Sequence, residues 1–302
     1  MSSPWKGVYP AATTQFHEDE SLDLEGTAQH VETLLDAGVD GLVMLGTLGE
    51  GTSLQHEEKL AVLETTVKTS AGRVPVLAGI AEPTTAGAIT LTRQADELGV
   101  DGVMVLPGLT YRSDHRETVT HYRRVAEDGG LPVMVYNNPV SYGVDVTPEA
   151  LRELADVEGI VAVKESSEDV RRITDIRNVV GDRYQLFCGV DDIALECLAA
   201  GADGWLAGLV DAFPDETVHL YRLMADARLD EARALYRWFM PLLHLDTNPR
   251  LVQNIKLAMV ERGWGRDTVR APRLPLAEPE RSEVLAVIRE ALANRPELPK
   301  SS

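Results

Sequence analysis

The group best placed to react with a substrate is a lysine that follows a strongly apolar run. Lys164 comes directly after Ile160-Val161-Ala162-Val163, and the chain contains only six lysines. Burial disfavours an ammonium ion, so this position predicts a lowered pKa and a neutral amine that can attack a carbonyl to form a Schiff base. The alternative is a structural lysine paired with Glu165 or with another acid at the rim of the fold.

Two further side chains could assist a Schiff-base lysine. Tyr136 ends the apolar run at 133–135, and a phenol beside Lys164 can relay protons to imine intermediates. Thr47 lies in the glycine-rich turn at 46–50, where its hydroxyl can bond the phenol and where backbone N–H groups can approach a substrate carboxylate. The alternatives are a core aromatic for Tyr136 and a plain turn for Thr47.

These residues all close short apolar runs that alternate with longer amphipathic segments. The runs are apolar on both faces, which is typical of strands buried in a parallel sheet and covered by helices. We expect eight strands, beginning near Lys6, Gly41, Val74, Gly102, Pro132, Ile160, Tyr184 and Gly204.

Eight strand-helix units over residues 1–227 predict a (β/α)8 TIM barrel of the α/β class. An open doubly wound sheet is the alternative, but no GxGxxG follows the first run. In a barrel, catalytic groups lie at the carboxyl ends of the strands, where the runs at 133–135 and 160–163 place Tyr136 and Lys164.

Residues 228–302 contain helical patterns alone, which predicts a C-terminal helical region. The expected helices cover 230–245, 249–262 and 279–293. Their apolar faces must pack on the barrel or on another subunit, so we expect a homo-oligomer.

Composition restricts the classes of function. The chain has 302 residues, 44% of them hydrophobic, and a formal net charge of -19, which argues against binding a nucleic acid or an anionic membrane. No apolar run approaches the roughly 20 residues of a membrane span, and no secretory signal is evident, so we expect a cytoplasmic protein.

The remaining candidate residues have structural interpretations. Cys188 and Cys197 are expected to be buried, reduced thiols, and the histidines show no metal-ligand spacing. The pair Asp191 and Asp192 is expected to cap the helix that follows it. Acids at this place also argue against the phosphate site that an isomerase of phosphorylated sugars would need.

Three motifs together carry a family resemblance. Gly-Thr-Leu-Gly-Glu at 46–50, Tyr-Asn-Asn-Pro at 136–139 and Val-Ala-Val-Lys-Glu-Ser at 161–166 resemble, in order and spacing, the motifs of the dihydrodipicolinate synthase and N-acetylneuraminate lyase family. The resemblance covers essentially the whole chain. It implies a class I aldolase barrel, usually a tetramer built as a dimer of dimers, that needs no metal or organic cofactor.

The resemblance also implies roles for individual residues. Lys164 would form the Schiff base, Tyr136 would donate and accept protons, and Thr47 would hydrogen-bond Tyr136. The backbone around Thr47 and Leu48 would hold the carboxylate of pyruvate or another 2-oxo acid. Gly189 and Leu206 match positions that line the pocket.

The sequence departs from the lysine-biosynthetic members at three places. Leu48 replaces a second threonine, Gly108 and Leu109 replace a tyrosine pair, and Ser141 occupies the position of an arginine that binds the aldehyde's carboxylate. True dihydrodipicolinate synthase activity is therefore not expected. Tyr111 either replaces the missing tyrosine after a two-residue shift or is only a loop residue.

The leading hypothesis is a Schiff-base lyase that acts on a 2-oxo acid by aldol cleavage or condensation, or by dehydration. The segment at 136–148 also resembles deaminases of 1-pyrroline-4-hydroxy-2-carboxylate, which use the same imine chemistry, and cleavage of a 2-keto-3-deoxy sugar acid would use the same lysine and tyrosine. A non-catalytic, metabolite-binding barrel is the alternative from another class.

Overall fold

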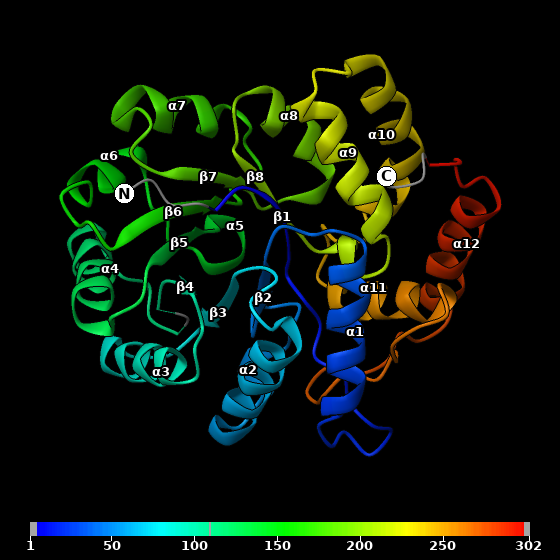
Figure 1. Ribbon diagram of the computed structural model, residues 1–302, viewed down its shortest axis with the longest axis horizontal. Coiled ribbons are helices and arrows are strands. Elements are labelled where there is room, and N and C mark those ends of the chain that lie inside the picture. Colours follow the sequence, from blue (N-terminus) through cyan, green and yellow to red (C-terminus); the bar gives the residue numbers. More distant parts are fainter. Residues whose placement is uncertain (1–4, 109, 299–302) are drawn as a thin grey trace.

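The computed structural model describes residues 5–108 and 110–298 and contains a barrel of eight parallel strands (Figure 1). The hydrogen-bonded order is β1-β8-β7-β6-β5-β4-β3-β2, and a bridge between Ala11 and Val43 joins the first and second strands. The predicted (β/α)8 barrel is confirmed, and the open sheet is not. The strands are β1 (Gly7–Pro10), β2 (Leu42–Met44), β3 (Val76–Ile80), β4 (Gly102–Val105), β5 (Val133–Asn137), β6 (Ile160–Glu165), β7 (Gln185–Cys188) and β8 (Gly204–Ala207).

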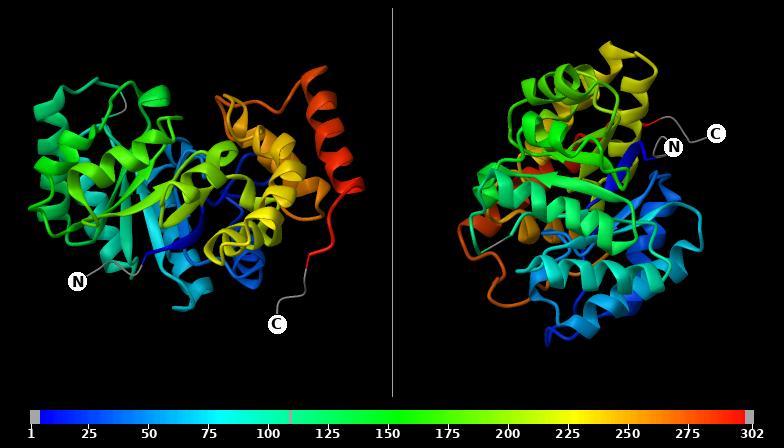
Figure 2. Two further views of the ribbon diagram at one scale, coloured as in Figure 1. Left: turned by 90° about the horizontal axis from the view of Figure 1, so that it is seen from above. Right: turned by 90° about the vertical axis from the view of Figure 1, so that its left-hand side faces the viewer.

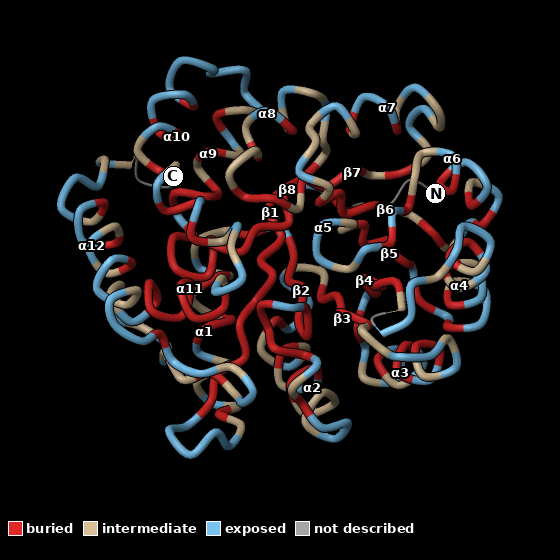
Figure 3. The backbone as a smooth tube through the Cα atoms, turned by 180° about the vertical axis from the view of Figure 1, so that it is seen from behind, coloured by how far each residue is buried: buried red, intermediate tan, exposed pale blue. Residues whose placement is uncertain are grey.

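The register of β5 and β6 brings the candidate catalytic residues side by side. Tyr136 on β5 pairs with Lys164 on β6, and Lys164 pairs with Phe187 on β7. The buried residues are concentrated in the strands and on the inner faces of the helices (Figure 3). The strand ends therefore deliver Tyr136 and Lys164 to one mouth of the barrel.

Helices cover the outside of the barrel and begin at polar caps. Asp23, Thr84, Asp114 and Thr147 accept backbone hydrogen bonds at four of these starts. The helices are α1 (Leu24–Asp36), α2 (His56–Ser70), α3 (Thr85–Glu97), α4 (His115–Gly129), α5 (Pro139–Tyr142), α6 (Pro148–Glu153), α7 (Arg171–Val180), α8 (Ala194–Ala199) and α9 (Pro214–Ala225).

The chain ends in three further helices, close to where the sequence predicts them. They are α10 (Leu229–Leu243), α11 (Leu251–Glu261) and α12 (Glu280–Ala293), and they lie along one side of the barrel (Figure 2). Phe239 on α10 packs against Phe213 with ring centroids 5.9 Å apart. Within the described residues, no helix is long and apolar enough to cross a membrane. Both cysteines are buried free thiols, as expected.

Candidate active site

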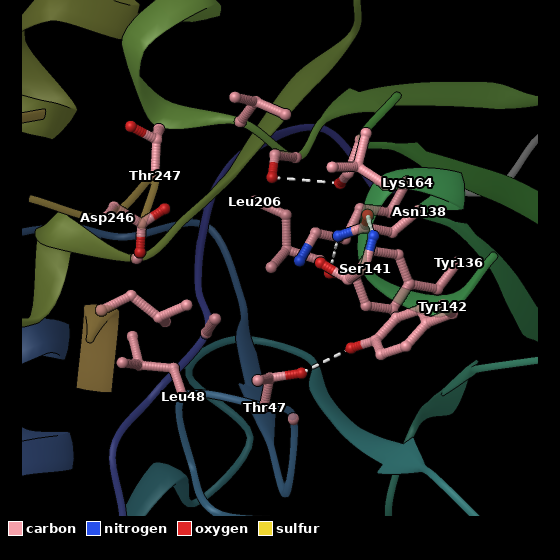
Figure 4. A pocket seen from close by; sticks show the side chains of 18 of the residues that line it. Thr47, Leu48, Tyr136, Asn138, Ser141, Tyr142, Lys164, Leu206, Asp246 and Thr247 are labelled. Atoms are coloured by element: carbon pink, nitrogen blue, oxygen red, sulfur yellow. Dashed lines mark hydrogen bonds between the residues drawn. The ribbon is translucent and has the colours of Figure 1, made fainter. Parts of the chain in front are cut away.

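A cavity of about 440 Å³ opens at the carboxyl ends of the strands (Figure 4). Every site residue predicted from the sequence lines this cavity, except Tyr111. The predicted residues in its wall are Thr47, Leu48, Tyr136, Ser141, Lys164, Gly189 and Leu206.

Lys164 is buried beside an aromatic ring and has no ion-pair partner among the described residues. It is 7% exposed, and its Nζ lies 4.1 Å from the centroid of the Tyr136 ring. Glu165 accepts hydrogen bonds from Asn137 Nδ2 at 2.9 Å and from Ser167 N at 2.7 Å, so it does not pair with Lys164. Burial lowers the pKa of Lys164, although nearby acidic groups oppose the shift. These are the conditions for a nucleophilic amine.

The hydroxyl of Thr47 pairs with a different tyrosine from the one predicted. Thr47 Oγ1 lies 2.7 Å from the hydroxyl of Tyr142, not from that of Tyr136, so the predicted Thr47–Tyr136 hydrogen bond is wrong. The rings of Tyr136 and Tyr142 meet edge to face, with centroids 5.7 Å apart. Burial raises the pKa of Tyr136, and hydrogen bonds with Asn138 and Tyr142 oppose that shift. Tyr142 thus links the buried phenol to the exposed threonine.

Tyr142 reaches this place because α5 is a single helical turn after β5. Asn138 caps the turn by accepting a hydrogen bond from Ser141 N at 2.9 Å, Pro139 occupies its first position, and Gly143 ends it with φ of 70°. This turn was not predicted from the sequence, although Asn-Pro at its start and glycine at its end are recognisable signals. The turn also brings Ser141 to the mouth of the cavity.

Gly189 leaves room for the Lys164 side chain. A Cβ at this position would lie 2.1 Å from Ser166 Oγ and 2.5 Å from Lys164 Cε. Ser166 Oγ donates a hydrogen bond to Gly189 O at 3.0 Å, which holds the ends of β6 and β7 together. The absence of a side chain at Gly189 therefore permits the observed position of Lys164.

The acids after β7 do not cap the next helix, which corrects the prediction. Asp191 is fully buried and accepts hydrogen bonds from Trp205 Nε1 at 2.9 Å and Leu209 N at 2.7 Å. Burial raises the pKa of Asp191 to about 6. Asp192 contacts His244 Nδ1 at 2.9 Å. Asp191 therefore joins the end of β7 to the end of β8, and Asp192 joins it to the turn after α10.

Tyr111 does not enter the cavity. It is 63% exposed, and its hydroxyl donates to Glu117 Oε1 at 3.0 Å. Leu109, the other candidate for this position, lies outside the described residues.

The C-terminal helical region contributes residues to the cavity that were not predicted from the sequence. Asp246, Thr247 and Asn248, in the turn between α10 and α11, line the cavity, and Asp246 and Thr247 lie across it from Lys164 (Figure 4). A Cβ on Gly208, the residue after β8, would lie 2.1 Å from Asp246 Oδ1. A glycine is therefore required at this position for the Asp246 carboxylate to occupy its observed place.

The described residues contain no group of three or more histidine, cysteine, aspartate or glutamate side chains able to hold a metal ion. Two of the histidines are paired with a neighbouring side chain. His30 is buried against Asp211, and His121 Nδ1 lies 3.0 Å from Thr85 Oγ1.

Comparison with known proteins decides the family. A family model described as the dihydrodipicolinate synthetase family matches residues 4–291. The chain belongs to this family. The resemblance seen in the three motifs is thereby confirmed, and with it the assignment to a family of aldolase-type lyases.

Members of the dihydrodipicolinate synthetase family resemble the chain over nearly its whole length. The 4-hydroxy-tetrahydrodipicolinate synthase of Methanothrix thermoacetophila is 33% identical, over 94% of this chain and 96% of the relative. The enzyme of the same name from Exiguobacterium sibiricum is 36% identical, over 90% and 92%.

Solved structures of the family share the fold. The prophage protein YagE of E. coli K12, in complex with pyruvate, superposes with a TM-score of 0.90 at 28% identity, over 96% of this chain and 99% of its own. The dihydrodipicolinate synthase of Acinetobacter baumannii, complexed with pyruvate, gives 0.90 at 27% identity, over 95% and 98%.

Proposed function

We propose that this protein forms a Schiff base between Lys164 and pyruvate or another 2-oxo acid, and that it is not a dihydrodipicolinate synthase. The observation that carries the proposal is the buried Lys164 amine, which forms no ion pair within the described part of the chain and lies in a cavity beside the Tyr136 phenol. The pyruvate bound in two structures of the family supports the choice of a 2-oxo acid.

The turn after β2 would hold the substrate carboxylate. Among the described residues, the backbone N–H groups of Thr47 and Leu48 donate to no acceptor, and both residues line the cavity. Adjacent free N–H groups in a tight turn favour an anion. A carboxylate bound there would direct the neighbouring carbonyl carbon towards Lys164.

The proposed reaction uses the neutral form of the lysine amine, which burial favours over the ammonium ion. The neutral Lys164 amine adds to the carbonyl, and the carbinolamine loses water to give a protonated imine that withdraws electrons from the next carbon. Tyr136 would donate and accept the protons of these steps. Its contact with Tyr142, which bonds the exposed Thr47, would connect the buried phenol to the mouth of the cavity. The lysine itself supplies the electron sink, so the proposed reaction uses no metal and no organic cofactor.

The distal part of the substrate separates this protein from the synthases. Ser141 offers a neutral hydroxyl where those enzymes are expected to have an arginine for the aldehyde's carboxylate, so binding of an aldehyde that carries a carboxylate is disfavoured. The second candidate is a deaminase of 1-pyrroline-4-hydroxy-2-carboxylate, which the sequence around Ser141 favours. Cleavage of a 2-keto-3-deoxy sugar acid uses the same groups.

Borohydride reduction in the presence of pyruvate tests the proposal. Intact mass and peptide mapping should find one stable adduct, on Lys164. Lys164→Ala should remove the adduct and abolish turnover while the fold is retained, and Tyr136→Phe should still be trapped but at a reduced rate. Failure to trap either pyruvate or longer 2-oxo acids would instead favour a non-catalytic barrel that binds a metabolite.

A further inference from the structure

The far wall of the cavity is acidic and belongs to the C-terminal helical region. We propose that Asp246 selects the substrate: it binds a hydroxyl on the carbons beyond the imine and rejects a second carboxylate. The inference rests on the proposed function, because it takes the imine at Lys164 as the fixed end of the substrate.

Of the three neighbouring acids Asp191, Asp192 and Asp246, Asp246 is the one whose carboxylate is available to a ligand. Asp191 and Asp192 are held by Leu209 N at 2.7 Å and by His244 Nδ1 at 2.9 Å. The half-buried Asp246 carboxylate accepts no hydrogen bond and forms no ion pair with any described residue, although it lines the cavity. In Figure 4 it lies across the cavity from Lys164, where the distal end of a substrate would extend.

The charges around the cavity exclude a second anionic group. Lys164 is the only cation among the described residues that line it, whereas Asp246 and Glu168 are both acids. Burial, reinforced by the charge of Asp191, raises the pKa of Asp246 well above its ordinary value. A substrate carboxylate beside Asp246 would add a further negative charge with no cation to pair with it, which is costly in a confined site.

A hydroxyl satisfies the same site without this cost. It can donate a hydrogen bond to the Asp246 carboxylate, or accept one from the carboxylic acid, and Ser141 at the mouth supplies another neutral hydroxyl. The substrate class is therefore a 2-oxo acid with one carboxylate and at least one hydroxyl on its distal carbons, or the cyclic imine of such an acid.

Three 2-oxo acids of equal chain length test this inference: 2-oxopentanoate, 4-hydroxy-2-oxopentanoate and 2-oxoglutarate. The measurement is the concentration of each acid that gives half-maximal borohydride adduct on Lys164, with adducts of the intact acid and of any cleavage product counted together. The wild-type protein should favour the hydroxy acid over 2-oxopentanoate by about ten-fold, as expected for a hydrogen bond to a charged group, and should disfavour 2-oxoglutarate by at least as much.

Two variants of Asp246 separate the effect of its hydrogen-bond acceptor from the effect of its negative charge. Asp246→Ala should abolish the preference for the hydroxyl. Asp246→Asn keeps an acceptor oxygen, so it should retain part of that preference while it lowers the penalty on 2-oxoglutarate by about ten-fold. Asp182→Asn is the control, because it also removes an acid but at a fully exposed side chain that does not line the cavity, and it should keep the wild-type order.

The outcomes are distinguishable. A hydroxyl preference that survives in a folded Asp246→Ala protein would overturn the inference, as would a wild-type protein that does not discriminate among the acids. If no acid, pyruvate included, forms an adduct with the wild-type protein, the proposed function fails and this inference fails with it.

Discussion

At the scale of single residues, the proposed chemistry depends on Lys164, which is buried and forms no ion pair with any described residue. Lys164 is placed by β6, packed over the Tyr136 ring and left without an ion-pair partner in the described residues. The same strand directs Glu165 to Asn137 and Ser167, so neighbouring residues with opposite charges do not neutralise each other. They do not pair because successive side chains along a strand point to opposite faces of the sheet.

The lowered pKa of Lys164 predicts the pH dependence of adduct formation. Only the neutral amine adds to a carbonyl, so trapping of pyruvate should be lost as the pH falls through the lowered pKa and should level off below 10.5, the ordinary value for lysine. The rate of adduct formation, measured by mass spectrometry across pH, checks this. A profile for Lys164 that levels off only above 10.5 would contradict the argument.

Gly189→Ala should disable the site without unfolding the protein. The new methyl group would lie 2.5 Å from Lys164 Cε, so the lysine must move away from the substrate carbonyl. We expect a loss of at least about ten-fold in kcat/KM, with a stability cost of about 1–3 kcal/mol from overpacking. Steady-state kinetics and thermal unfolding measure the two effects.

Gly108→Ala is the control for this substitution. Its Cβ would make an ordinary contact, 3.5 Å from Tyr111 O, so both activity and stability should stay near the wild-type values. Equal effects of the two substitutions would show that Gly189 has no particular relation to Lys164.

At the scale of elements, the turn after β2 is held from the far end of the chain. Lys256 on α11 donates to Glu50 Oε1 at 2.7 Å and to Thr268 O at 2.8 Å, and the side chains of Lys256 and Glu50 are both fully buried. Arg270 N donates to the other oxygen of Glu50 at 2.9 Å. The C-terminal helical region therefore fixes the turn that would bind the substrate carboxylate.

Lys256→Met should be strongly destabilising. Removal of one partner leaves the buried Glu50 carboxylate without its closest cation, which typically costs about 3–5 kcal/mol. Denaturant unfolding measures the change in free energy. Lys68→Met is the matched control: Lys68 pairs with Glu64 at 2.7 Å, but their side chains are 71% and 52% exposed, so its loss should change stability by less than about 0.5 kcal/mol.

At the scale of the whole molecule, the barrel and the C-terminal helices share one hydrophobic core. Phe239 and Leu242 on α10 and Ile255 on α11 are fully buried in the same cluster as the strand residues. The homo-oligomer, the cytoplasmic location and the division of the chain at residue 228 all stay predictions.

A fragment that ends at residue 227 should not fold. Without α10 to α12, Phe213 and its neighbours would become an exposed apolar surface, and the turn after β2 would lose Lys256. The full chain should unfold in a single cooperative transition, whereas the fragment should aggregate or lack one, as judged by circular dichroism and light scattering. A stable fragment with a cooperative transition would show instead that residues 1–227 form an independent domain.

The sequence by itself determined the barrel, the positions of its strands and the approach of Tyr136 to Lys164. Hydrophobic periodicity marks each strand and where it ends, and the order of a barrel then sets which ends are neighbours. The C-terminal helices were equally predictable from the sequence, since each combines an apolar stripe with recognisable ends.

Only the tertiary structure decided how the side chains pair within the site. The hydroxyl of Thr47 pairs with that of Tyr142, 95 positions further along the chain. Asp191 accepts a hydrogen bond from Leu209 N after β8 and does not cap the adjacent helix, and Asp246, which follows α10, lines the cavity. Each of these contacts depends on the exact path of a loop and on the side-chain conformations that close packing selects. Local sequence patterns predict neither the loop path nor these side-chain conformations, because the contacting residues lie far apart along the chain.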